Sequence, residues 1–143
     1  PDSQPVAVVK PKETEILLRR VEEAVESGRI DAARKVIDHA MKNEPAAKLA
    51  PWRYWNGRCL EAGAQNNDDR LRAAEEYMRV AIHFPNDPHA AESLYRTAMI
   101  HKKLGYLNRV APLLREALSH NPGDELKRRC EQALAETATS PKP

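Results

Sequence analysis

The chain has 143 residues, of which 41% are hydrophobic and 31% are charged. This composition predicts one soluble domain with a core made mainly of Ala, Leu, Ile and Val. Its 23 basic and 21 acidic residues are well mixed, and the net charge of +2 excludes nucleic-acid binding driven by charge alone. No uncharged apolar run approaches the roughly 18 residues of a membrane span, so membrane insertion of this sequence is not expected.

Residues 1–11 contain three prolines and no helical period, so we expect an extended linker there and a folded domain over residues 12–136. The first helix should begin at Lys12 and end at Gly28, where glycine suits a left-handed cap. A second helix should follow and stop before Pro45. The apolar residues that define these two helices are Leu17, Val21, Ala24, Val25, Ile30, Ala33, Ile37 and Ala40.

A second helix pair is predicted between Pro51 and Pro85. Pro51 lies where the first turn of a helix tolerates proline, and this helix should break near Gly63. The loop of residues 65–69 ends in side chains that favour a helix N-cap. The apolar positions are Trp52, Trp55, Cys59 and Ala62 in the third helix and Leu71, Ala74, Met78 and Ala81 in the fourth.

The third pair has the clearest helical period. Asp87 caps its first helix and Pro88 opens it, a glycine turn follows, and residues 121–123 close the second helix. The apolar stripes of this pair are Leu94, Ala98 and His101, then Val110, Leu114 and Ala117. A seventh helix over residues 124–136 should cap the domain, and residues 137–143 should form a flexible tail. This helix should turn Leu126, Cys130, Ala133 and Leu134 inward and Lys127, Arg128 and Glu131 outward.

The three helix pairs are repeats of one template, at about residues 14–47, 52–87 and 91–124. Aligning them by Pro45, Pro85 and Pro122 places small residues at common positions, where helices must cross closely. The second repeat fits only with extra residues in its loop and an insertion before Pro51. The shared small positions are Val21, Cys59 and Ala98, then Ala33, Ala74 and Val110, then Ala40, Ala81 and Ala117, while Leu17, Trp55 and Leu94 fill a large position.

This pattern resembles the tetratricopeptide repeat, whose unit of about 34 residues carries such small, large and proline positions. The resemblance covers about residues 12–136. It implies an all-α fold, a right-handed α-solenoid of three helix hairpins with a C-terminal capping helix, and a role in binding other proteins. The motif residues themselves are structural and specify no ligand.

Two segments also resemble the style of bacterial envelope proteins with these repeats. They are YWNGRCLEAG and YMRVAIHFPNDPHAAESLYRTAMIHKKLG, in repeats two and three. The similarity is to proteins associated with the Tol-Pal system and to the helical lipoprotein of the outer-membrane assembly machinery. It implies a periplasmic or envelope location for a membrane-tethered chain, with the cytoplasm as the alternative.

In a stack of this kind the first helix of each repeat lines a concave groove, which is the expected binding site. An apolar pair one turn apart, Tyr95 and Met99, suits an extended or helical peptide, and the nearby cations suit its backbone or a carboxylate. Alternatively, the apolar pair is partly core and the cations are solvated. The groove residues predicted by template position are Leu18, Glu22, Arg53, Asn56, Leu60, Tyr95, Met99 and Lys102.

The clamp of Lys and Asn with which some family members bind acidic chaperone tails is not matched. Leu18, Glu22 and Glu92 stand at the corresponding positions, and only Arg96 agrees. A chaperone tail is therefore not an expected ligand.

No catalytic or cofactor-binding constellation is predicted. The five histidines lie apart without metal-ligand spacing, and the acidic loop at residues 66–69 lacks the spacing of a calcium loop. Adjacent carboxylates on a helix point about 100° apart and make no acid–base pair. Cys59 and Cys130 are expected as small buried hydrophobes, with a disulfide between them as the alternative.

The sequence thus predicts a non-catalytic interaction module that binds a partner protein or peptide without metal or cofactor. One alternative is self-assembly as a homodimer, because Ile16, Leu17 and Leu18 are consecutive apolar residues on an uncapped first helix. Another is a regulatory domain of a larger enzyme.

Overall fold

The computed structural model describes residues 9–139, and within this range the chain is all-helical with no strand. Seven α-helices follow one another, with short 3₁₀ turns η2 (Ala46–Lys48) and η3 (Leu107–Arg109) between some of them. The helices are α1 (Val9–Glu26), α2 (Ile30–Asn43), α3 (Ala50–Ala62), α4 (Asn67–His83), α5 (His89–Leu104), α6 (Val110–Ser119) and α7 (Asp124–Thr139). The expected all-α class is confirmed.

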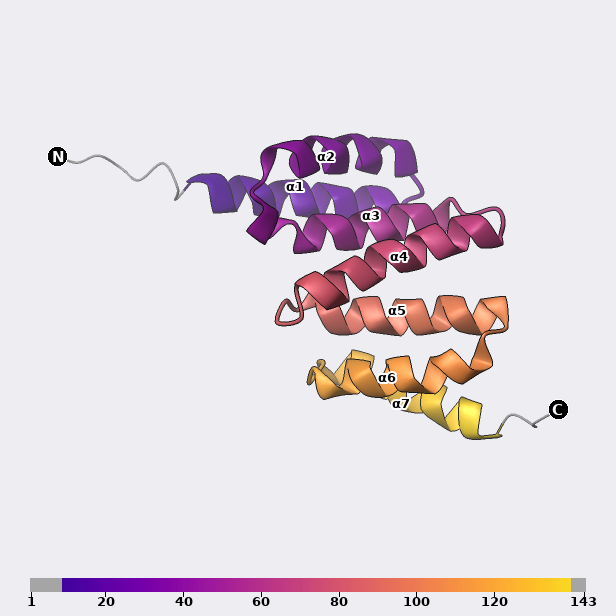
Figure 1. The fold of residues 1–143 in the computed structure, drawn as a ribbon. Coiled ribbons are helices and arrows are strands. Elements are labelled where there is room, and N and C mark those ends of the chain that lie inside the picture. The colour runs from indigo at the N-terminus through magenta and orange to yellow at the C-terminus, as the bar shows by residue number, and fades with distance from the viewer. Residues whose placement is uncertain (1–8, 140–143) are drawn as a thin grey trace.

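Each helix packs against the next one along the chain, with α1 and α2 at one end of the molecule and α6 and α7 at the other (Figure 1). In addition α1 contacts α3, and α3 contacts α5. We call the side formed by α1, α3, α5 and α7 the odd-helix face, and the side formed by α2, α4 and α6 the even-helix face. Short connections make sequence neighbours antiparallel neighbours in space.

The core consists of two clusters of buried side chains, one centred on α1 to α4 and the other on α5 to α7. All nine positions at which the sequence predicts small buried residues are at most 6% exposed, from Val21 and Cys59 to Ala117. Small side chains let neighbouring helices approach closely, which explains why alanine dominates these positions. Of the expected large residues, Leu94 and Trp55 are buried, while Leu17 is only partly buried.

A glycine lies where α3 packs tightly against α4. A Cβ atom added to Gly57 would lie 2.7 Å from Cε1 and 2.8 Å from Cδ1 of the fully buried Tyr77 ring. These distances are shorter than any ordinary carbon–carbon contact. The ring of Tyr77 therefore packs directly on the backbone of α3.

Both ends of the helical domain extend further than the sequence suggested. α1 begins at Val9, three residues before Lys12, and includes Pro11 in its first turn, where the missing N–H costs no hydrogen bond. α7 continues to Thr139 instead of ending at residue 136. The rest of the expected linker and tail, residues 1–8 and 140–143, lies outside the described residues.

The connections follow the predicted chemistry with two corrections. α5 begins at His89, with Pro88 at its N-cap position, although the Asp87 side chain does accept a hydrogen bond from the His89 N–H. Gly28 and Gly105 have φ angles of 82° and 86°, the left-handed conformation expected of glycine after a helix. The loop predicted over residues 65–69 is shorter, because the Asn66 side chain accepts a hydrogen bond from the backbone N–H of Asp69. This cap starts α4 at Asn67.

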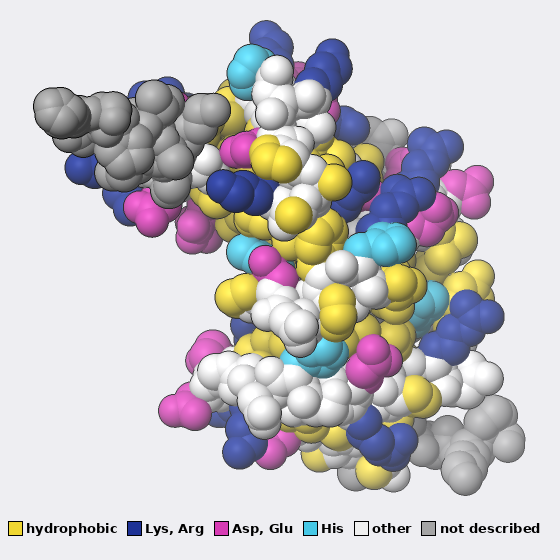
Figure 2. Space-filling view, turned by 60° about the vertical axis from the view of Figure 1, so that its left-hand side comes forward, with side chains coloured by type: hydrophobic (Ala, Val, Ile, Leu, Met, Phe, Trp, Pro, Cys, Tyr) yellow, Lys and Arg dark blue, Asp and Glu magenta, His cyan; other side chains and the backbone are white. Residues whose placement is uncertain are grey.

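The surface mixes charges of both signs. On the side shown in Figure 2, Lys and Arg side chains are interspersed with Asp and Glu. Within residues 9–139, no helix combines the length and the apolar character that crossing a bilayer requires.

Candidate functional site

The third-repeat residues of the predicted groove lie together on the odd-helix face, where α5 faces α7. Tyr95, Met99, Arg129 and Glu136 line a cleft of about 150 Å³. The Arg129 guanidinium lies 5.0 Å from the centre of the Tyr95 ring, and Lys102 Nζ is 3.1 Å from Glu136 Oε1. Tyr95 and Met99 also pack partly against the second core cluster. The side chains of Tyr95 and Met99 are thus partly buried in the core and partly exposed at the surface.

The first-repeat residues face the same side at the other end. Leu18 is half-buried against the first core cluster and Glu22 is exposed. Val25 continues their stripe by one helical turn. It lines a shallow cleft of about 290 Å³ with Arg58 and Glu61 of α3, and with Arg96 of α5.

The second-repeat residues lie elsewhere, so the eight predicted residues do not form one groove. Arg53 Nη1 and Asn56 Nδ2 donate hydrogen bonds of 3.2 and 2.9 Å to Glu76 Oε2 on α4. Leu60 lines a different cleft of about 170 Å³ with Arg34 of α2 and Arg72 of α4. Arg53, Asn56 and Leu60 therefore face the even helices.

This correction has a physical reason in the rotation of α3. The template aligned Cys59 with Ala98, but Gly57 is the residue that packs directly on the partner helix. A shift of two residues turns a helix by about 200°. The residues of α3 on the odd-helix face are consequently Tyr54, Arg58 and Glu61. They have the same spacing along their helix as Tyr95, Met99 and Lys102 have along α5.

Glu76 of α4 accepts hydrogen bonds from the side of α3 that faces the even helices. Its side chain is only 4% exposed and, besides Arg53 and Asn56, it accepts a 2.9 Å hydrogen bond from Arg79 Nη1. A buried carboxylate requires partners of this kind, because an unpaired charge in the protein interior is unfavourable. Arg53 and Asn56 are thus engaged within the molecule.

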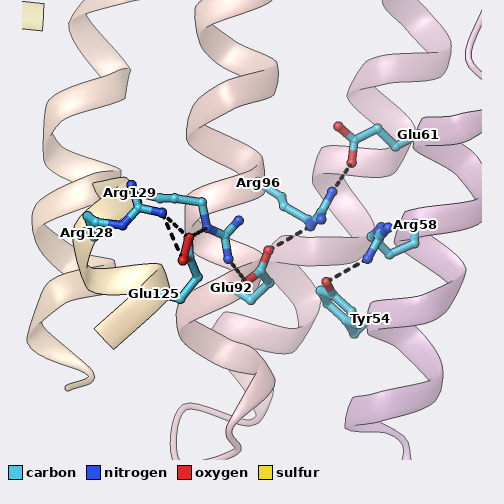
Figure 3. A network of polar contacts seen from close by, with 8 residues as sticks. All are labelled: Tyr54, Arg58, Glu61, Glu92, Arg96, Glu125, Arg128 and Arg129. Atoms are coloured by element: carbon cyan, nitrogen blue, oxygen red, sulfur yellow. Dashed lines mark hydrogen bonds and ion pairs between the residues drawn. The ribbon is translucent and has the colours of Figure 1, made fainter. Parts of the chain in front are cut away.

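A row of alternating arginine and glutamate side chains crosses the odd-helix face from α3 to α7 (Figure 3). Glu61 Oε1 accepts a 2.6 Å hydrogen bond from the Tyr77 hydroxyl and lies 3.5 Å from Arg96 Nη1. Arg96 Nε donates to Glu92 Oε2 at 3.0 Å, and Arg129 Nη2 donates to Glu92 Oε1 at 3.1 Å. Glu92 therefore bridges arginines from two helices. We call these residues the arginine–glutamate row.

The row ends differently on its two sides. On α7 the exposed Glu125 pairs with Arg128, whose hydrogen bond and positive charge lower the pKa of that carboxyl. On α3 Arg58 lies 5.0 Å from the centre of the Trp55 ring and donates to the Tyr54 hydroxyl at 3.3 Å. Within the described residues Arg58 forms no ion pair with a carboxylate, which leaves most of its donors available.

The row also fixes the ionisation of Tyr77. Burial, followed by the neighbouring Glu61 carboxylate, raises the pKa of the Tyr77 hydroxyl well above its ordinary value of 10. The hydroxyl therefore remains a neutral donor to Glu61. This bond joins the core packing of Tyr77 on Gly57 to the surface position of Glu61 and Arg96.

Among residues 12–138, no group of three or more His, Cys, Asp or Glu side chains is placed to hold a metal ion. Cys59 and Cys130 are unbonded and fully buried in separate core clusters, which confirms them as small core residues. Burial raises the pKa of both thiols, that of Cys130 to about 11.

Comparisons of the chain with protein-family models, with curated proteins and with solved structures find no match.

Proposed function

We propose that the chain is a non-catalytic protein-interaction module that binds an extended or helical segment of a partner protein on its odd-helix face. In this proposal the three helix pairs form a right-handed solenoid of tetratricopeptide type, closed by α7. The observations that support such a fold are the consecutive antiparallel packing and the additional α1–α3 and α3–α5 contacts. Stacked hairpins of this kind create extended binding surfaces.

The observation that carries the functional proposal is the chemistry of the odd-helix face. Half-buried Tyr95 and Met99 lie beside the arginine–glutamate row, with a shallow cleft on each side of it. Aromatic and arginine side chains provide much of the binding energy at protein interfaces. Arg96 and Arg129 are already held in place by Glu92, so a partner need not order them.

The test is selection of binders from a displayed library of random peptides, followed by affinity measurements on two matched double variants. Tyr95→Ala with Lys102→Glu changes one apolar and one charged residue on the odd-helix face. Leu60→Ala with Arg72→Glu makes the same kinds of change on the even-helix face. We expect the first pair to weaken binding at least about tenfold and the second to leave it unchanged, with circular dichroism confirming that both fold.

Two results contradict the proposal. One is a library that yields no binder to the folded chain. The other is a set of binders whose affinity survives Tyr95→Ala with Lys102→Glu. In the second case the partner surface lies elsewhere on the molecule.

Self-assembly remains the second candidate, favoured by one observation. Ile16 on α1 is 46% exposed, beside the half-buried Leu17 and Leu18. A symmetric contact between two copies of α1 would cover this patch. A light-scattering concentration series tests it, since a monomer at all concentrations removes this candidate.

A further inference from the structure

We propose that the partner segment bound on the odd-helix face carries an acidic side chain, Asp or Glu, that pairs with Arg58 of α3. This inference rests on the function proposed above and specifies the chemistry of the partner. The site is the cleft of about 290 Å³ between α1, α3 and α5, which we call the Arg58 cleft. Besides Arg58, the cleft is lined by Val25, Glu61, Ala62 and Arg96.

Arg58 differs from the other arginines of this face because it lacks an acidic partner. Arg96 and Arg129 each form an ion pair with Glu92. No carboxylate of residues 12–138 lies within ion-pair distance of Arg58, which donates one hydrogen bond of 3.3 Å to the Tyr54 hydroxyl (Figure 3). A guanidinium group has five N–H donors, so four of them remain for a bound molecule.

Aromatic packing holds the Arg58 guanidinium in place. Its central carbon lies 5.0 Å from the centre of the Trp55 ring. Trp55 is 8% exposed and Tyr54 is 5% exposed, and their rings pack edge to face with centres 5.2 Å apart. Arg58 itself is only partly exposed. A partner therefore meets a guanidinium whose position is already set, so little side-chain entropy is lost on pairing.

The carboxylate in the cleft is engaged by other groups. Glu61 lies three residues after Arg58 on the same helix. Its Oε1 atom accepts the 2.6 Å hydrogen bond from the Tyr77 hydroxyl and lies 3.5 Å from Arg96 Nη1. These contacts hold Glu61 away from Arg58, which explains why the two do not form an ion pair within α3.

α1 contributes negative charge beside the cleft. Glu22 and Glu26 are exposed, one turn before Val25 and next to it, and neither forms an ion pair with Arg58. Exposed charges beyond contact distance are screened by water and salt, whereas a carboxylate in contact with a guanidinium forms two parallel charge-assisted hydrogen bonds. Recognition of the acidic side chain thus comes from direct pairing with Arg58 and not from the net charge of the face.

The arrangement of the helices also sets a spacing in the partner. α3 and α5 are in contact, and the axes of packed helices lie about 8–10 Å apart. An extended chain advances about 3.3 Å per residue. The acidic residue should therefore lie about two to four residues from the apolar residue that contacts Tyr95 and Met99.

The test starts from peptides selected on the folded chain from a displayed random library. Each is synthesised with an amidated C-terminus, so that only side chains supply carboxylates. We expect the selected sequences to share an Asp or Glu about two to four residues from an apolar residue. Replacing this Asp by Asn, or this Glu by Gln, should weaken the affinity at least about tenfold in fluorescence anisotropy.

A double-mutant cycle assigns the pairing to Arg58. Arg58→Gln should weaken binding of the acidic peptide at least about tenfold and leave the amide peptide nearly unchanged, with circular dichroism confirming the fold. Arg58→Lys should restore only part of the loss, because lysine cannot form the bidentate pair. Arg72→Gln on the even-helix face is the matched control and should change neither affinity. Glu22→Gln should strengthen binding of the acidic peptide, since it removes a like charge beside the cleft.

Each other outcome overturns the inference. Selected peptides that depend on Tyr95 and Met99 without an acidic residue remove the pairing and leave the proposed function standing. Equal weakening of the acidic and amide peptides by Arg58→Gln assigns Arg58 a structural role. Binding that requires phosphoserine in place of Glu identifies a phosphate group as the occupant, and weaker binding in Glu22→Gln identifies a basic one. A library without any binder contradicts both this inference and the proposed function.

Discussion

Replacing Gly57 by alanine tests the packing that sets the rotation of α3. In an ordinary exposed helix interior this substitution stabilises by about 1 kcal/mol, because alanine loses less backbone entropy than glycine. Here the new Cβ would meet the Tyr77 ring at 2.7 Å. The ring cannot withdraw freely, since it is fully buried and its hydroxyl is bonded to Glu61 at 2.6 Å.

Overpacking of this kind costs about 1–3 kcal/mol, and the gain in helix propensity offsets about 1 kcal/mol of it. We therefore expect Gly57→Ala to lower the free energy of unfolding by about 1 kcal/mol. The control is Gly63→Ala at the end of α3, where the nearest atom to an added Cβ is an ordinary contact at 3.5 Å. It should change stability by less than about 0.5 kcal/mol.

The assay is urea unfolding followed by circular dichroism, with a shifted midpoint at an unchanged slope. A Tyr77→Leu background sharpens it, because the smaller side chain removes the ring atoms that meet the new Cβ. In that background Gly57→Ala should become neutral or stabilising. The reasoning is refuted if Gly57→Ala stabilises the otherwise unchanged chain, or if its effect is the same in both backgrounds.

Three further predictions concern buried polar groups. Glu76→Gln should lower the free energy of unfolding by about 1–2 kcal/mol. The loss is smaller than for a fully buried ion pair, because Arg53 is partly exposed. An unchanged urea midpoint contradicts this prediction. Cys59 and Cys130 should react slowly with a thiol reagent at pH 8 and rapidly in denaturant, since burial raises the pKa of both; prompt reaction of the native protein contradicts it. Burial, followed by the charge of Arg109, lowers the pKa of His101 below 6.5. Below that pH the unfolded chain therefore binds more protons than the folded chain, and the stability of the fold decreases as the pH falls through 6.5. His101→Gln should reduce this fall between pH 7.5 and 5.5, and an identical pH profile for the variant excludes His101 as its source.

The helices were predictable because the spacing of their apolar residues determines which side of each helix is buried. Val110, Leu114 and Ala117 recur at helical intervals, and all three are fully buried. Glycine and asparagine at the connections also follow from local chemistry, as Gly28 and Gly105 show. The helix ends were less predictable, since a proline such as Pro11 fits equally in a linker or in a first turn.

The rotation of α3 was not predictable from the repeat pattern, and the site depended on it. Trp52, Tyr54, Trp55, Gly57 and Cys59 are all buried, so this helix is apolar around much of its circumference. A stripe that wide does not determine which side faces the partner helix. The close glycine–aromatic contact determines it, and only the three-dimensional packing identifies that contact. Of the residues that the sequence predicted for a groove, those of repeats one and three therefore lie on the odd-helix face, and those of repeat two lie toward the even helices.

The arginine–glutamate row depends on the same rotation. Its cross-helix pairs join residues 35 and 37 positions apart in sequence, Arg96 with Glu61 and Arg129 with Glu92. A different rotation of α3 would turn Glu61 away from Arg96, and the Tyr77 hydroxyl would lose its acceptor. Core packing at Gly57 and surface charge on the odd-helix face are thus one coupled arrangement. A substitution in the α3–α4 core should consequently alter the binding that we propose for the odd-helix face, even where the domain remains folded.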